Sequence, residues 1–222
     1  MNRSILVINP NANQDVTDGL RRALASFSLP GRLAIECLTL AEGPFGIETQ
    51  SDVERVAMPL AGLVRGRADA DAFVIACYSD PGIDVCRSVT SKPVFGIQES
   101  GILTAMTRGE RVGVIALSDA SVPRHRRYVR RMGVESRVAG ECAINRSVDE
   151  SASAEDMLVV LTKAGRCLMA DGADVIVLGC AGMARHRAGV EAALGIPVID
   201  PVQAAVAMAL GAVLAAMTGA VE

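Results

Sequence analysis

An internal repeat is the feature that most constrains how this chain can fold. Residues 70–77 (ADAFVIAC) and residues 173–180 (ADVIVLGC) share one pattern, a short apolar run that ends on a cysteine, Cys77 or Cys180. Each cysteine is followed by a turn of small or polar residues and then by a stretch with a helical pattern. The same unit of structure is therefore expected twice in the chain.

The match extends beyond the cysteines. A proline-led strand follows in each half, Lys92–Ile97 in the first and Ile196–Asp200 in the second. The segments that open the two halves, Arg3–Asn9 and Arg111–Leu117, match more weakly. A repeat of roughly a hundred residues is too long for a solenoid. The sequence therefore predicts two similar lobes that arose by duplication.

Strand-like and helix-like segments alternate along the chain. Short apolar runs typical of strands buried on both faces of a parallel sheet occupy Ser4–Ile8, Ala72–Ala76, Val112–Ala116 and Asp174–Gly179. Amphipathic helical patterns occupy Asp15–Phe27, Val53–Val64, Val122–Met132 and Glu155–Asp171. This alternation predicts an α/β protein with two pseudo-symmetric Rossmann-like lobes, each with a parallel sheet, and an active site in the cleft between them. We expect residues 1–98 with 205–222 to form the lobe of Cys77, and residues 99–204 to form the lobe of Cys180.

The two repeated cysteines stand where parallel sheets place their ligands. Each ends a predicted strand, and ligands bind beyond the carboxyl ends of such strands. The turns that follow have free backbone N–H groups, which can hold an anion or enolate and help lower a thiol pKa. A single cysteine at a strand end is usually a small core residue, but two at matching positions favour a function. The other four are expected to be inert, because they lie in or beside strand-like runs or in helical stretches: Cys37, Cys142, Cys86 and Cys167.

Three weaker signals have two interpretations each. Asn9-Pro10-Asn11 follows the first strand and is either a ligand loop or an ordinary strand-exit turn with a helix cap. The segment 43–48 (GPFGIE) is a lid or merely a turn. His125 and His186 stand among arginines, and a solvated surface position is favoured for both. No metal site is predicted, since a metal would need more histidines or a tighter acidic cluster.

Composition and missing motifs exclude several classes of function. The formal net charge is -3 without a basic stripe, and Trp is absent, which argues against nucleic-acid binding. The two lysines, Lys92 and Lys163, stand before a proline and inside a helical stretch, so a Schiff-base lysine for pyridoxal phosphate is disfavoured. No P-loop and no GxGxxG motif follows a strand. We therefore expect a small-molecule substrate and no cofactor.

The two ends of the chain bear on its location. A hydrophobic strand begins after three residues, with no signal-peptide pattern, so a cytoplasmic location with reduced thiols is expected. Val202–Val221 is nearly all apolar, but it is rich in alanine, is interrupted by Gln203 and lacks basic flanks. These features favour a buried terminal helix over a membrane span.

Four motifs together resemble the aspartate/glutamate/hydantoin racemase superfamily, and its hydantoin and allantoin racemase branch in particular. They are Val7–Asn11, Ile75–Cys77 with Asp80–Gly82, Val177–Met183 and Pro197–Asp200. The resemblance covers almost the whole chain, and the second cysteine motif is its most specific part. It implies two lobes, no cofactor, a homo-oligomer, and one catalytic cysteine from each lobe, Cys77 and Cys180. It also implies a site lined by the loops of Asn9 and Ile47 and by neighbours of the cysteines, Tyr78, Ser79, Ala181 and Gly182.

This chain departs from the superfamily pattern around the expected pocket. Ala116-Leu117 followed by Ser118 stands where a Thr-Thr pair is common, so Leu117 and Ser118 are expected to line the site in its place. Tyr78 replaces a frequent Phe, and Ser79 and Gly46 also differ from the usual residues. The acid/base pair is intact, but these changes leave the substrate open.

The resemblance and the repeat lead to one hypothesis of mechanism. One cysteine, held as thiolate, removes the proton next to a carbonyl, N–H groups near Ser79 and Gly182 stabilise the enolate, and the other cysteine delivers a proton to the opposite face. A 5-substituted hydantoin or allantoin is the preferred substrate, since no charged clamp for a free amino acid is evident. Three alternatives stay open: an arylmalonate decarboxylase-like enzyme, a maleate cis–trans isomerase-like enzyme, and a non-catalytic small-molecule binding protein.

Overall fold

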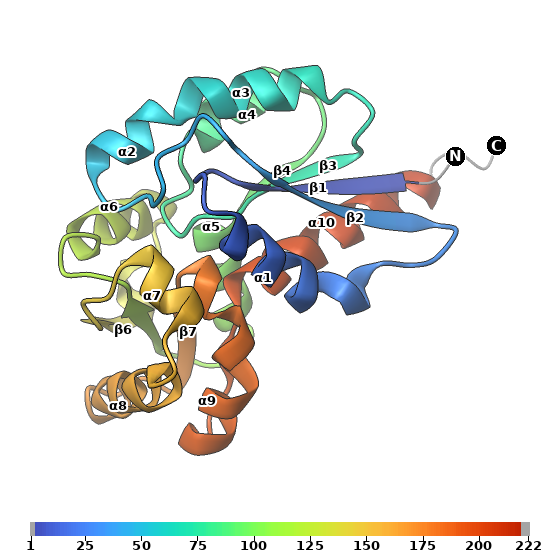
Figure 1. Ribbon diagram of the computed structural model, residues 1–222. Helices are drawn as coiled ribbons and strands as arrows, with labels where there is room; N and C mark the ends of the chain where they lie inside the picture. Colours follow the sequence, from blue (N-terminus) through green and yellow to red (C-terminus); the bar gives the residue numbers. More distant parts are fainter. Residues whose placement is uncertain (1–2, 219–222) are drawn as a thin grey trace.

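The computed structural model describes residues 3–218 and contains two parallel sheets of four strands each (Figure 1). The first sheet has the order β2-β1-β3-β4 and the second has the order β6-β5-β7-β8, so both follow one plan. The first sheet consists of β1 (Arg3–Asn9), β2 (Leu33–Thr39), β3 (Ala72–Ile75) and β4 (Val94–Gly96). The second consists of β5 (Val112–Ala116), β6 (Val138–Ala143), β7 (Val175–Gly179) and β8 (Val198–Ile199). The predicted two-lobed α/β fold is confirmed.

The central strands are apolar because both of their faces are covered. In β1, Ile5 and Val7 enter a core shared by the two lobes, whereas Leu6 and Ile8 enter a separate core on the outer face of the first sheet. Outer strands show a weaker pattern, since in β2 Leu33 is buried while the next residue, Ala34, is exposed. Because of this weaker pattern, the sequence alone does not show where β2 and β6 begin and end.

Helices cover the faces of both sheets, and their bounds differ from the sequence patterns in detail. The α-helices are α1 (Gln14–Leu24), α2 (Gln50–Arg55), α3 (Ala57–Gly66), α4 (Ile83–Ser88), α5 (Ile97–Ala105), α6 (Val122–Met132), α7 (Val148–Ser153), α8 (Met157–Ala170), α9 (Arg187–Leu194) and α10 (Pro201–Thr218). Short 3₁₀ segments are η1 (Ala25–Phe27), η2 (Glu135–Arg137) and η3 (Ala181–His186). The predicted helix Val53–Val64 is divided between α2 and α3. Pro59 accounts for the break, because it has no N–H to donate to the carbonyl of Arg55.

The last helix of each half packs across to the other half. Helix α10 follows the second sheet but packs against β1, β3 and β4, and α5 follows the first sheet but packs against β7 and β8. Figure 1 shows α10 running between the two lobes, where Val202, Val206 and Ala209 are fully buried. The predicted terminal helix is confirmed up to Thr218, and it is buried along one face, whereas residues 214–216 are exposed. Residues 219–221 of the prediction lie outside the described residues. This crossing of α5 and α10 to the opposite sheets is consistent with a lobe boundary near residue 98. The boundary itself stays a prediction.

Within residues 3–218, no helix is long and apolar enough to cross a membrane.

Candidate active site

One cavity lies where the carboxyl ends of the central strands of both sheets meet. It holds about 500 Å³ of empty space, including its opening to solvent. Residues that follow β1, β3, β5 and β7 form most of its wall, and the loop after β2 and the start of α7 complete it. The lining residues are Asn11, Val16, Ile47, Glu48, Ala76, Cys77, Tyr78, Ser79, Leu117, Ser118, Ser121, Arg124, His125, Val148, Gly179, Cys180, Ala181 and Gly182.

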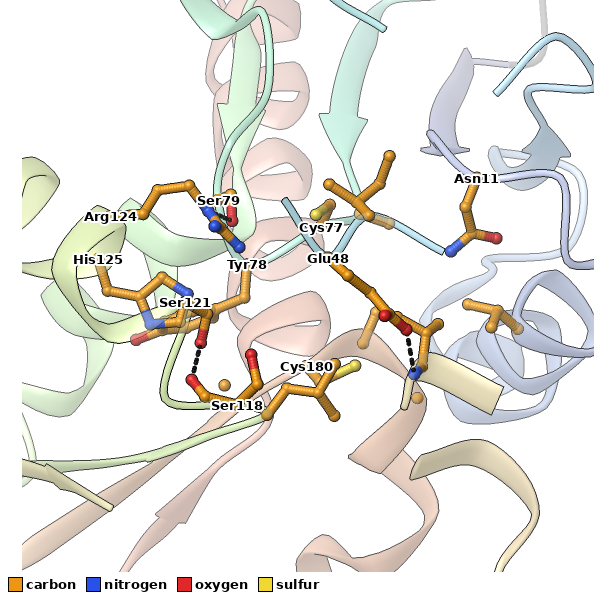
Figure 2. A pocket seen from close by; sticks show the side chains of 18 residues that line it. Asn11, Glu48, Cys77, Tyr78, Ser79, Ser118, Ser121, Arg124, His125 and Cys180 are labelled. Carbon is orange, nitrogen blue, oxygen red and sulfur yellow. Dashed lines mark hydrogen bonds between the residues drawn. The ribbon is translucent and has the colours of Figure 1, made fainter. Parts of the chain in front are cut away.

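The two repeated cysteines occupy matching positions in this cavity. Cys77 lies two residues beyond the end of β3 and Cys180 directly follows β7, and Figure 2 shows their side chains on opposite walls. Each sulfur accepts a hydrogen bond from the backbone N–H two residues further on, that of Ser79 for Cys77 and that of Gly182 for Cys180. In addition, the Ser151 hydroxyl lies 3.4 Å from the Cys180 sulfur. Equivalent turns in the two halves therefore present a backbone N–H to each thiol.

Both thiols are protonated at neutral pH. Removal from bulk water raises the pKa of Cys77 to about 12, although the Ser79 N–H and the Arg124 guanidinium act in the opposite direction. Burial also raises the pKa of Cys180, against the Ser151 hydroxyl and the Gly182 N–H. Desolvation outweighs the backbone N–H groups at both sulfurs, which favours the thiol over the expected standing thiolate in the free protein. These N–H groups also point at the sulfurs, where they stabilise a thiolate rather than an enolate.

Most of the residues expected from the sequence come together around the thiols. Besides Cys77 and Cys180, the cavity wall includes Ile47, Tyr78, Ser79, Leu117, Ser118, Ala181 and Gly182.

The geometry does not support the predicted substrate contact of Asn9. Its side chain is fully buried outside the cavity wall, and its amide nitrogen donates to Asn11 Oδ1 at 2.9 Å, Asn13 O at 3.0 Å and Thr17 Oγ1 at 3.1 Å. Its side-chain oxygen Oδ1 accepts a hydrogen bond from the backbone N–H of Asn11 at 3.2 Å. Asn9 thus shapes the loop, Asn13 caps α1, and Asn11 reaches the cavity.

The segment 43–48 closes over the cavity and joins the two lobes. The Gly43 backbone lies so close to the Pro10 carbonyl that a Cβ there would stand 2.3 Å from the oxygen. Ile47 is buried in the cavity wall, and one carboxylate oxygen of Glu48 accepts a hydrogen bond from the Val148 N–H at 3.2 Å (Figure 2). Of the two interpretations of this segment, a cover over the site fits better than an isolated turn.

His125 is a correction to the sequence analysis. It is 3% exposed instead of solvated, its Nδ1 lies 2.9 Å from a Glu141 carboxylate oxygen, and its ring meets the Tyr78 ring edge-on at 5.0 Å. The arginines on either side of His125 in α6 suggest an exposed segment, although His125 itself is buried. The signal was its spacing, because His125 and Val129 are four residues apart and share the buried face of the helix. His186, by contrast, is half-buried and accepts a hydrogen bond from Arg185.

Asp80 fixes the turn that carries Cys77. It has a left-handed backbone with φ of 42°, and its buried carboxylate accepts from the N–H groups of Gln98 at 2.8 Å and Glu99 at 2.9 Å, at the start of α5. Burial raises the pKa of Asp80 to about 7. A Cβ on Gly96 would lie 2.2 Å from this carboxyl group, so a glycine is needed there. Asp80 therefore holds the turn after Cys77 against the start of α5, the helix that packs on the second sheet.

The four remaining cysteines lie outside the cavity wall. All six are free thiols, and of these four Cys37 and Cys86 are buried, Cys142 is half-buried and Cys167 is exposed. In the part of the chain that the structure describes, no group of three or more His, Cys, Asp and Glu side chains could hold a metal ion.

Comparison with solved structures places this fold and cavity in a class. The chain is similar to an allantoin racemase from Klebsiella pneumoniae, with a TM-score of 0.89 and 28% identity, covering 97% of this chain and 89% of that one. An allantoin racemase from Pseudomonas fluorescens has the same TM-score and identity, with 96% and 92% covered. A variant of arylmalonate decarboxylase, with a TM-score of 0.73 and 18% identity over 95% and 92% of the two chains, shares the fold alone. The architecture is the two-lobed fold of the Asp/Glu racemases.

Comparison of sequences gives the family. The sequence model of the Asp/Glu/hydantoin racemases matches residues 5–209. A hydantoin racemase of Paenarthrobacter aurescens is 34% identical over 214 residues, covering 90% of this chain and 87% of the relative. A hydantoin racemase of Rhizobium meliloti is 36% identical over 214 residues, covering 92% and 86%. The chain belongs to the Asp/Glu/hydantoin racemase family, and it is an enzyme of the racemase class.

Proposed function

We propose that this racemase needs no cofactor and inverts a carbon next to a carbonyl, with Cys77 and Cys180 as its acid/base pair. One observation carries the proposal: two thiols at equivalent strand ends of two equivalent sheets face one cavity, each with a backbone N–H on its sulfur. Two such groups on opposite walls can address opposite faces of a planar intermediate.

The proposed reaction transfers one proton on each face. As the substrate enters the cavity, one cysteine gives its proton to solvent, from which the enzyme takes one back when the product leaves, and the resulting thiolate takes the hydrogen from the stereocentre. The C–H electron pair moves into the neighbouring carbonyl as an enolate. The facing cysteine, still protonated, then donates its proton to the other face of the same carbon. In the reverse direction the two cysteines exchange roles, which their similar surroundings permit.

A 5-substituted hydantoin or allantoin is the proposed substrate class. In these rings the carbon that would be inverted lies next to a carbonyl, so its hydrogen is acidified. The hydantoin and allantoin racemases that resemble this chain over most of its length support the same class.

The test follows optical rotation of single-enantiomer allantoin and of several 5-substituted hydantoins, with the uncatalysed decay subtracted. We expect enzyme-dependent loss of rotation with at least one of these rings. L-aspartate, L-glutamate, maleate and an arylmalonate are assayed beside them. If maleate or the arylmalonate is converted while no ring loses rotation, the proposed reaction is wrong. If only L-aspartate or L-glutamate loses rotation, or if no compound reacts, the proposed substrate class is wrong.

The raised thiol pKa values predict how activity depends on pH. Below its pKa a thiol is protonated, so the thiolate fraction of the free enzyme rises about tenfold with each pH unit as long as the pH stays below that pKa. Because the pKa of Cys77 is raised to about 12 and that of Cys180 is also raised, kcat/KM is expected to rise with a slope near one from about pH 6.5 to 9. Initial rates across this range, each corrected for base-catalysed enolisation, check it. A plateau that begins below about pH 8 would mean that the free enzyme already holds a thiolate.

Three further expectations from the sequence stay predictions. They are a homo-oligomer, a cytoplasmic location, and the division into residues 1–98 with 205–222 and residues 99–204.

A further inference from the structure

A guanidinium without an acidic partner lies in the cavity wall beside Cys77. Arg124 is half-buried, and its Nε donates to the Ser79 hydroxyl at 2.9 Å (Figure 2). Among the described residues no carboxylate is within ion-pair distance of it, and Asp52 acts on it only at longer range. Burial accordingly lowers the pKa of Arg124, although the group stays charged. Charges withdrawn from water are normally paired, so an unpaired one in a ligand cavity points to a partner on the ligand.

Arg124 differs from the arginines in the last turn of α6, which form ion pairs. Arg130 pairs with Glu135 and Arg131 pairs with Asp84, so the outer part of the helix is neutralised locally. Arg127, one turn beyond Arg124, donates only to the neutral Gln50 side chain, at 2.8 Å.

Arg124 and Arg127 lie in line from the cavity to a neighbouring hollow on the protein surface. Both line a second hollow, between the segment 48–50 and the start of α6, which also includes Glu48 and adjoins the cavity at Arg124. Within residues 3–218 neither arginine has a carboxylate at ion-pair distance, although Glu48 lines the same hollow, so two guanidinium groups mark the way from the protein surface to Cys77. Such a pair attracts anions and raises their local concentration.

The cavity wall also carries one carboxylate that is not paired with Arg124. Glu48 also lines the cavity, its carboxylate acts electrostatically on Cys180, and it accepts the Val148 N–H instead of pairing with Arg124. The cavity is thus polarised, with a cation beside Cys77 and an acceptor of N–H donors near Cys180. A ring with N–H groups and an anionic substituent matches this arrangement.

We propose that Arg124 binds an anionic side chain of the substrate, so that the preferred substrates are 5-substituted hydantoins with a carboxylate on the substituent. This inference rests on the proposed function. The carboxylate accepts hydrogen bonds from the guanidinium beside Cys77, and the ring N–H groups donate towards Glu48. Arginine is suited to this role because its planar guanidinium offers several donors to a carboxylate. Arg124 is then a specificity-determining residue rather than a group that moves a proton.

The test compares 5-(2-carboxyethyl)hydantoin with 5-(2-carbamoylethyl)hydantoin, which has nearly the same shape and no charge. Wild type is expected to favour the carboxylate in kcat/KM by about tenfold or more, since a hydrogen bond to a charged group contributes about 1.5–3 kcal/mol. Arg124→Gln is expected to lose about 10- to 100-fold more in kcat/KM on the carboxylate than on the amide, with the excess loss mainly in KM. A smaller loss common to both substrates is expected because the guanidinium also lowers the pKa of Cys77. Arg124→Lys is expected to keep part of the preference. Arg126→Gln, on the exposed face of the same helix, is the matched control and should leave both rates unchanged.

The outcomes separate this inference from the function on which it rests. If wild type racemises the amide as well as the carboxylate, or if Arg124→Gln lowers both rates equally, Arg124 does not select an anionic substituent. An equal loss would mean that Arg124 acts on the Cys77 thiol instead. If wild type racemises neutral hydantoins but not the carboxylate, the inference fails while the proposed function stands. If it racemises none of them, the proposed function itself has failed.

Discussion

Replacing either facing cysteine with serine is expected to reduce racemisation by about a thousandfold or more. A positioned acid or base contributes about 10²–10⁴ to a rate, and a serine hydroxyl is a far weaker acid than a thiol, so it can neither supply an anion nor readily give up its proton. Cys77→Ser and Cys180→Ser should each have this effect, because every inversion needs both walls of the cavity. The measurement is the initial rate of optical-rotation loss with the best substrate found.

The same two variants should differ from each other in proton exchange. With Cys180→Ser the remaining Cys77 can still remove a hydrogen from the face that it meets and return a solvent proton to that face. One enantiomer should then exchange with D₂O without inversion, and Cys77→Ser should exchange the other enantiomer. Cys167→Ser is the control, since that thiol is exposed on α8 and lies outside the cavity wall. If both cavity variants exchange the same enantiomer, or if either keeps more than about a tenth of the wild-type rate, the two thiols are not the acid/base pair.

Gly179→Ala is expected to destabilise the protein. Gly179 ends β7 directly before Cys180, opposite Ala116 of β5, and a Cβ on it would lie 2.5 Å from the Ile115 carbonyl oxygen. The obstructing atoms belong to the backbone of the neighbouring strand, so no side-chain rotation relieves the clash. Overpacking of this kind costs about 2–3 kcal/mol of unfolding free energy. For a chain of this length it should lower Tm by about 5–10 °C.

Gly140→Ala provides the matched comparison for that substitution. Gly140 lies in β6 of the same sheet, and a Cβ there would meet only the Leu168 side chain, at an ordinary 3.8 Å. Its Tm should change by no more than about 2 °C. Gly179→Ala should also reduce activity below its own melting range, because displacement of the strand end moves Cys180. Equal melting temperatures for the two variants would contradict this account of the strand end.

The sequence predicted the fold and the paired cysteines well for a physical reason. Strands buried on both faces must be apolar throughout, and duplication placed Cys77 and Cys180 at the same point of two such patterns. The neighbours of each cysteine in the chain are necessarily its neighbours in space, so Tyr78, Ser79, Ala181 and Gly182 followed directly. The outer strands and the break at Pro59 were less visible because half-buried segments carry a diluted pattern.

The parts of the site that the sequence did not predict depend on contacts between distant residues. His125 meets Tyr78, and Arg124 meets Ser79, only because α6 of one lobe lies against the cysteine turn of the other. The contact of His125 with Glu141 joins α6 to β6 within one lobe. Asn9 and Asn11 are both polar residues in one turn, and only the folded loop shows which of them faces inward. The thiol pKa values likewise depend on desolvation by both lobes, which no local motif encodes.

Deuterium incorporation during wild-type turnover tests the two-thiol mechanism most directly. A single-enantiomer hydantoin is incubated with the enzyme in D₂O, stopped at low conversion, and separated on a chiral column before mass analysis. With one base on each face, the product enantiomer should carry one deuterium while the remaining substrate enantiomer stays protiated. If the remaining substrate gains deuterium as fast as the product does, one group serves both faces, and the assignment of Cys77 and Cys180 as a facing pair is wrong.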